Sequence, residues 1–169
     1  MTIQRSDTII RLHNDDWGYE TNCFVCEPRN ERGLQIAFFH DVSRVMVTAE
    51  FELDDAYSGA PTLLHGGVIL AVLDEAMAWA CIAIGGQWAV TTETNARFRQ
   101  VMRVGSRYRV EAEVVEHVES TIRTTARVLD GRDRVRAEAD ATFVALGEAQ
   151  VVEWAGRPVD DRHRSDLRD

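Results

Sequence analysis

Lysine is missing from this 169-residue sequence, so all 19 basic side chains are arginine, and they are outnumbered by 28 acidic ones. The formal net charge is −9. Because phosphate groups are bound by basic surfaces, this balance argues against a general nucleic-acid partner and against an anionic membrane partner. Proline is scarce, at three residues, and no low-complexity tract appears. Both facts argue against long disordered segments away from the chain ends.

Cysteine is also scarce: three residues are too few for a disulfide framework and leave one unpaired. The first residues lack the apolar stretch and small-residue cleavage site of an export signal. The longest apolar run, 68–84, is interrupted by Asp74 and Glu75, which favours a buried helix over a bilayer span. These absences predict a reduced, cytoplasmic protein without a membrane partner.

The chain is long enough for one domain, and 45% of its residues are hydrophobic. We expect an N-terminal extension over 1–33, a folded domain over 34–147 and a charged C-terminal tail over 148–169, frayed from about residue 150. One strong helix is predicted over 67–84, ended by Gly85 and Gly86. Alternation and turn residues predict strands at 34–40, 44–53, 89–100, 106–117, 120–129 and 134–146, with a hairpin turn at Asp130 and Gly131.

The predicted order is two strands, one apolar helix and four strands in a meander. Sequential strands usually pair, so the fold class is α+β, with a largely antiparallel sheet. A helix that is apolar all round must be covered on all sides, and one sheet curled around it satisfies most of this need. One side of the helix and an edge strand stay open, which predicts a dimer or a larger assembly.

Two acids lie in the middle of the apolar helix. A buried, unpartnered carboxylate is costly and tends to raise its pKa. Asp74 shares its helix face with Ala71 and Ala78, whose small side chains leave room for a ligand. Glu75 has a structural alternative, as a hydrogen-bonding partner for a neighbouring segment. Asp74 is therefore the stronger candidate for chemistry.

The helix is preceded by His65, Gly66 and Gly67. Two glycines at a helix N-terminus leave backbone N–H groups unshielded at the positive end of the helix dipole. This arrangement suits an oxyanion developing on a carbonyl, where one good donor lowers the barrier by ~3 kcal/mol. The alternatives are a Gly-Gly turn that serves only packing, and a His65 that is structural and not a base.

The run from His65 to Ala76 resembles the hotdog-fold acyl-CoA thioesterases of the PaaI-like group. Their signature is HGG at the start of the central helix and an acid nine positions after the histidine, here Asp74. Four further stretches look like that group: 22–26 (NCFVC), 57–61 (YSGAP), 90–92 (VTT) and 97–99 (RFR). The resemblance covers roughly residues 22–147.

The resemblance implies a hotdog fold, a homodimer that often packs into a homotetramer, and an acyl-CoA substrate held between subunits, with no cofactor. It implies that the N–H of Gly67, helped by His65, polarises the thioester carbonyl. Asp74 of the facing protomer then attacks it or deprotonates a water that Thr91 or Thr92 positions. Gly66 and Glu75 are expected to line the substrate. Some relatives place an amide before the HGG motif, where this chain has Ser58 and Gly59.

Three arginines, Arg97, Arg99 and Arg103, fall on one face of a strand by a period of two. They are candidates for binding coenzyme A phosphates, because the guanidinium group forms forked hydrogen bonds with anions. The alternative is a solvated strand face. Cys23 and Cys26 supply two ligands where a structural zinc site needs four, and the spacings of His13 and His40 match no metal motif. We therefore expect no metal and no redox role.

Two other functions remain open at this point. A hotdog enoyl-thioester hydratase or dehydratase acts on similar substrates, but the HGG opening argues against it. A non-catalytic acyl-CoA-binding module would have no need for Asp74. The sequence leaves undecided the acyl group and the choice between coenzyme A and carrier-protein thioesters.

Overall fold

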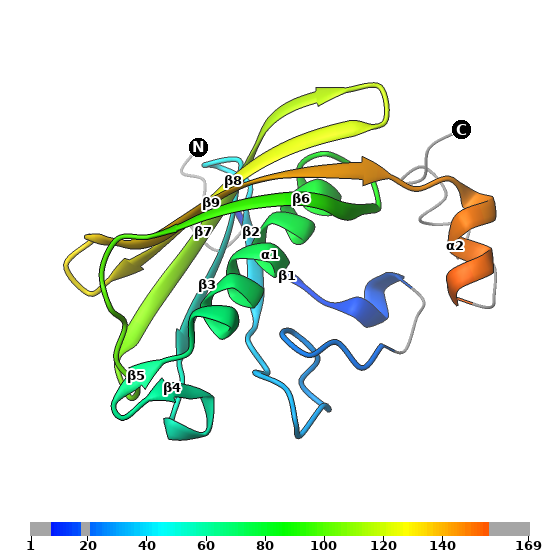
Figure 1. The fold of residues 1–169 in the computed structure, drawn as a ribbon. Helices are drawn as coiled ribbons and strands as arrows, with labels where there is room; N and C mark the ends of the chain where they lie inside the picture. Colours follow the sequence, from blue (N-terminus) through cyan, green and yellow to red (C-terminus); the bar gives the residue numbers. More distant parts are fainter. Residues whose placement is uncertain (1–7, 18–20, 156–169) are drawn as a thin grey trace, which may run out of the picture.

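A seven-stranded antiparallel sheet packs against one long helix, α1 (Gly66–Ala83), in a computed structural model that describes residues 8–17 and 21–155 (Figure 1). The strand order is β1-β2-β3-β7-β8-β9-β6. The strands are β1 (Ile9–Leu12), β2 (Phe38–Asp41), β3 (Met46–Glu52), β6 (Ala89–Phe98), β7 (Arg107–Val118), β8 (Thr121–Asp130) and β9 (Val135–Ala145). A small hairpin of β4 (Ser58–Ala60) and β5 (Leu63–Leu64) lies before α1, and α2 (Glu148–Ala155) follows β9.

The predicted α+β hotdog architecture is confirmed, but the predicted meander of four strands is wrong at one place. Strands β7, β8 and β9 do pair in sequence, whereas β6 pairs with β9 and forms the far edge of the sheet. Helix α1 explains the difference. At a rise of ~1.5 Å per residue it is about 27 Å long, so it carries the chain across the sheet to the side opposite β3.

Helix α1 buries one side against β3, β6, β7, β8 and β9. Its buried residues are Ile69, Val72, Leu73, Ala76, Met77, Trp79, Ala80 and Cys81. The other side, which carries Leu70, Ala71, Asp74 and Ala78, is only partly buried. Among the described residues, α1 is the one helix long and apolar enough to cross a membrane, and its packing against the sheet is that of a core helix.

The boundaries of several elements differ from the predictions. Strand β3 starts at Met46, because Val45 adopts a positive φ of 52° in the preceding turn and is 56% exposed. Strand β2 starts only at Phe38, although Leu34 and Ile36, in the loop that leads to it, are buried.

Both ends of the described chain contribute structure that the sequence analysis did not predict. Within the predicted extension, β1 pairs with β2, and η2 (Asn14–Trp17) follows it. Within the predicted frayed tail, α2 buries Val151 against Leu146. Residues 156–169 lie outside the described part.

Candidate active site

The histidine of the HGG motif forms the N-cap of α1. The Gly67 N–H donates to His65 Nδ1 at 2.9 Å, and the His65 carbonyl accepts from the N–H groups of Val68 and Ile69. An imidazole that accepts at Nδ1 is neutral and carries its proton on Nε2. The Gly67 N–H therefore has a partner within the protomer, and the imidazole offers a second donor, Nε2–H, beside it.

The segment before α1 holds the His65 side chain in place. The His65 N–H donates to the Tyr57 carbonyl at 2.9 Å, and the Tyr57 hydroxyl donates to the Gly33 carbonyl at 2.7 Å. A Cβ on Gly59 would lie 3.0 Å from His65 Cδ2, and one on Gly67 would lie 3.1 Å from His65 Nδ1. These two glycines therefore let the imidazole lie between two stretches of backbone. The sequence pattern indicated the turn at Gly59 but not this contact.

Asp74 lies on the partly buried side of α1, beside strand β6. The Thr91 hydroxyl donates to Asp74 Oδ1 at 3.0 Å. Burial raises the pKa of Asp74, and the hydrogen bond from Thr91 opposes that shift only in part. The Asp74 carboxyl group is thus held by a hydrogen bond and is more basic than that of an ordinary aspartate. Both properties suit proton transfer near neutral pH.

The two candidate threonines are separated by a strand irregularity. The pairing of β6 with β9 shifts register between Thr91 and Glu93. As a result the Thr92 hydroxyl donates to the Thr142 carbonyl, at 3.0 Å. Of the two hydroxyl groups, the structure brings Thr91 to Asp74 and directs Thr92 to strand β9.

Glu75 is turned away from Asp74 by the ~100° that separates consecutive residues of a helix. Its Oε1 lies 3.4 Å from Cys23 Sγ in the N-terminal segment. Burial raises the pKa of Glu75 to about 8. Glu75, which was predicted to line the substrate, therefore does not lie with Asp74 and Thr91.

The predicted arginine face is wrong for Arg103, because β6 ends at Phe98 and Arg103 lies in the following loop. The Arg103 guanidinium donates to the Thr62 hydroxyl at 3.4 Å, and Arg103 pairs with Leu63 of β5. Arg97 pairs with Asp140 at 3.2 Å and Arg99 with Glu138 at 2.5 Å. Both are therefore already neutralised by acids of β9.

Arg97 faces away from α1. In the register of β6 and β9, Ala96 and Phe98 lie opposite the buried residues Ala139 and Ala137, so the residue between them points to the outer face. Asp140 lines two cavities, of about 330 and 310 Å³, and Arg97 and Glu138 also line the first. Neither cavity is lined by Asp74 or His65.

Phe98 is a candidate site residue that the sequence analysis did not single out. It lies on the α1 side of β6 and is 52% exposed, and its Cζ is 3.8 Å from the position a Cβ on Gly66 would take. An exposed ring beside the HGG motif offers an apolar contact to a ligand or to a second subunit. The sequence contains one indication of this role. Phe98 lies between two arginines and two positions after Ala96, so strand alternation puts it on the same inward face as Ala96.

Comparisons with known proteins agree with this fold. Residues 62–137 match the family model of the thioesterase superfamily. A thioesterase superfamily protein of known structure shares 20% identity, with a TM-score of 0.64 over 69% of this chain; the chain spans 57% of that protein. A Streptococcus mutans protein bound to acetyl-CoA shares 20% identity, with a TM-score of 0.58, over 60% of this chain and 82% of that one.

The E. coli PaaI protein, from the phenylacetic acid degradation operon, shares 17% identity, with a TM-score of 0.57, over 61% of this chain and 74% of that one. No curated protein matches the chain significantly. At these identities the structural likeness establishes the fold. Together with the family match over 62–137, it confirms that this chain is similar to the hotdog-fold thioesterases of the PaaI-like group.

Proposed function

We propose that this protein is an acyl-CoA thioesterase, which hydrolyses a thioester to a free acid and coenzyme A. The match to the thioesterase superfamily supports the reaction class, and the structural likeness to a protein that binds acetyl-CoA supports the substrate class. The observation that carries the proposal is Asp74: an acid on a core helix, facing the uncovered side, with a raised pKa and a threonine hydroxyl on its Oδ1.

The two halves of the proposed chemistry are too far apart to act within one protomer. Asp74 follows Gly67 by seven residues of helix, which separates them by about 10 Å along the axis of α1. The carbonyl carbon and oxygen of a thioester are one bond apart. One thioester therefore cannot contact both the Gly67 N–H and the Asp74 carboxylate of the same helix. An active site therefore needs the HGG end of one protomer and Asp74 of its partner.

In such a site the thioester carbonyl accepts from the Gly67 N–H, which it shares with His65, and from the imidazole Nε2–H. Asp74 removes a proton from a water held by Thr91, and the water oxygen attacks the carbonyl carbon. The C–S bond then breaks, and the departing thiolate receives from Asp74 the proton that came from the water. Direct attack by the Asp74 carboxylate, with cleavage of the C–S bond and release of the thiolate, gives an anhydride; its hydrolysis by water uses the same residues and restores Asp74.

Arg103 is the best of the three arginines for a coenzyme A phosphate. Within the described residues its guanidinium contacts a neutral hydroxyl, whereas the guanidinium groups of Arg97 and Arg99 pair with acids. Its pairing with Leu63 places it beside the strand that leads directly to His65. Gly66 and Phe98 lie at the same end of α1 and are proposed to contact the acyl group or the coenzyme A arm.

A panel of acyl-CoA substrates tests the proposed function. Release of free thiol, followed with a thiol reagent, is the expected result for at least one short, long or aromatic acyl group. Loss of enoyl absorbance without thiol release would instead identify a hydratase. Saturable binding of acyl-CoA without turnover would leave a binding module, and either of these outcomes contradicts the proposal.

The protein is expected to be a dimer or a larger assembly in solution. One protomer leaves the Asp74 side of α1 partly open, the edge strand β6 unpaired on its outer side within the described residues, and Phe98 and Val101 at 52% and 60% exposure. Sedimentation equilibrium at micromolar concentration should give at least twice the 19.1 kDa chain mass. A single species of chain mass that nonetheless hydrolyses thioesters would contradict the shared site.

A further inference from the structure

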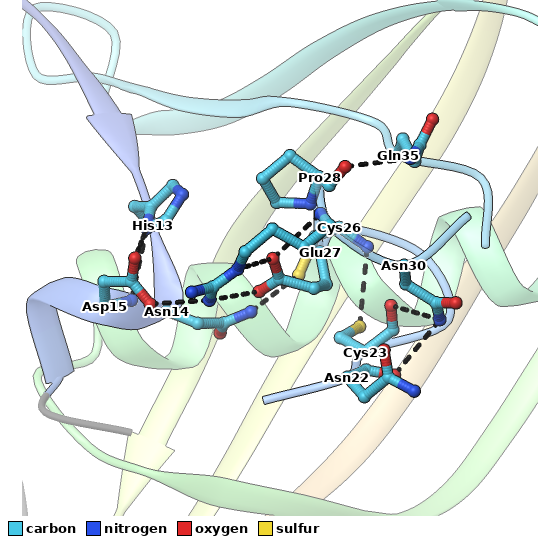
Figure 2. A network of polar contacts seen from close by, with 11 residues as sticks. His13, Asn14, Asp15, Asn22, Cys23, Cys26, Glu27, Pro28, Asn30 and Gln35 are labelled. Atoms are coloured by element: carbon cyan, nitrogen blue, oxygen red, sulfur yellow. Dashed lines mark hydrogen bonds and ion pairs between the residues drawn. The ribbon is translucent and has the colours of Figure 1, made fainter. Parts of the chain in front are cut away.

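Glu75 of α1 contacts a loop that holds two cysteines, Cys23 and Cys26. Figure 2 shows this loop and the polar contacts around it. One ligand atom from each of Cys23, Cys26 and Glu75 lies within 4.8 Å of the other two. All three side chains are partly buried. In the sequence only the two cysteines lie near each other as possible metal ligands. The fold adds a third, Glu75, which is 52 positions after Cys23.

Both cysteine sulfurs of the loop accept hydrogen bonds from neighbouring groups. The N–H groups of Val25 and Cys26 donate to Cys23 Sγ at 3.3 and 3.4 Å, and the Asn14 amide donates to Cys26 Sγ at 3.2 Å. Backbone donors to a cysteine sulfur stabilise its thiolate form, which is the form that binds metals. Asn30 also donates to the Asn22 and Cys23 carbonyls, which fixes the start of the loop.

The cluster brings two thiol groups and one carboxyl group together in a partly buried place. No arginine within residues 8–17 and 21–155 forms an ion pair with Glu75. A bound divalent cation would supply the missing positive charge and let all three groups ionise.

We propose that Cys23, Cys26 and Glu75 form a binding site for a thiophilic divalent cation such as Zn²⁺. Two thiolates at ~2.3 Å and one carboxylate oxygen at ~2.1 Å are a normal ligand set for zinc. The spread of the ligand atoms fits one ion between them with small side-chain movements. Three protein ligands leave the fourth tetrahedral position to water or to an external ligand.

The site ties the N-terminal segment to the central helix. It is separated from the contact between Asp74 and Thr91 by the ~100° that lies between consecutive residues around α1. The cation is therefore expected to stabilise the chain and to leave thioester hydrolysis to Asp74. This inference does not depend on the proposed thioesterase activity.

Metal content and cobalt spectroscopy of the reduced protein test the site. We expect about one zinc per chain after incubation and desalting, and thiolate-to-cobalt charge-transfer absorption when Co²⁺ is added. Cys81→Ser, which removes the cysteine buried elsewhere on α1, should behave as the wild type. The double variant Cys23→Ser/Cys26→Ser should lose the zinc and the absorption band while keeping turnover per folded enzyme.

Glu75→Gln tests the third ligand without touching the sulfurs. It should keep the charge-transfer band and bind zinc more weakly, by more than the ~10–100-fold that loss of a supporting group costs. Zinc should also raise the Tm of the wild type and not that of the double variant. Failure of the reduced wild type to bind zinc or Co²⁺, unchanged binding in the double variant, or a Cys23–Cys26 disulfide as the only chemistry of the pair would overturn the proposal.

Discussion

Replacing Asp74 with asparagine is expected to lower kcat for thioester hydrolysis by about 10²–10⁴-fold, the usual cost of losing a general base. The amide keeps the shape of the side chain and still accepts the hydrogen bond from Thr91, but it neither takes a proton nor attacks a carbonyl. KM should change little, because the substrate arm and the HGG end are untouched. The fold should survive, since removing a partly buried charge often costs no stability. Steady-state kinetics and thermal unfolding of the same preparation check both statements.

Glu75→Gln is the matched control on the neighbouring helix position. It removes the neighbouring carboxyl group, which points to Cys23 and not to Thr91, so its loss of kcat should be much smaller. Near wild-type hydrolysis by Asp74→Asn would favour the acyl-CoA-binding module. A larger loss in Glu75→Gln than in Asp74→Asn would move the catalytic role one residue along α1.

His65 is expected to have two separable roles, and two substitutions should distinguish them. His65→Ala removes the acceptor of the Gly67 N–H and should cost about 0.5–2 kcal/mol of stability, as the loss of an N-cap does. His65→Asn restores a capping oxygen and should recover most of that stability. Both variants remove the imidazole Nε2–H, and each should lower kcat by about 10²-fold if it donates to the oxyanion.

Thermal unfolding and steady-state kinetics of the pair give the comparison. The expected pattern is a stable, slow His65→Asn and a less stable, slow His65→Ala. A His65→Asn variant with wild-type kcat would show that the histidine is a helix cap only, and that the backbone N–H of Gly67 polarises the carbonyl without it.

The sequence predicted most reliably what local interactions determine. The limits of α1 follow from His65 and from Gly85 and Gly86, signals that lie within a few residues of each helix end, and its start was predicted within one residue. The position of β6 was not predictable in the same way, because its partner depends on how far α1 carries the chain. Asp74 and Thr91 were both expected at the site, yet only coordinates separate Thr91 from Thr92 at the register shift.

Contacts between distant segments account for the remaining differences. The pairing of Glu75 with Cys23 joins positions 52 residues apart, and neither local sequence indicates the other. The prediction that the arginines share one strand face failed for Arg103, because a period of two holds only while a strand continues, and β6 stops before Arg103. Helix α2 forms where a buried Val151 meets Leu146, within the segment that was predicted to be a charged tail.

The spacing of Gly67 and Asp74 along α1 has a genetic consequence. If each site takes one end of the helix from each subunit, a dimer holds two sites that divide the same residues in opposite ways. In a mixed dimer of Asp74→Asn and His65→Ala chains, one site inherits both lesions and the other inherits neither. Two alleles that are inactive alone would then complement each other when coexpressed, and neither would be fully dominant over the wild type.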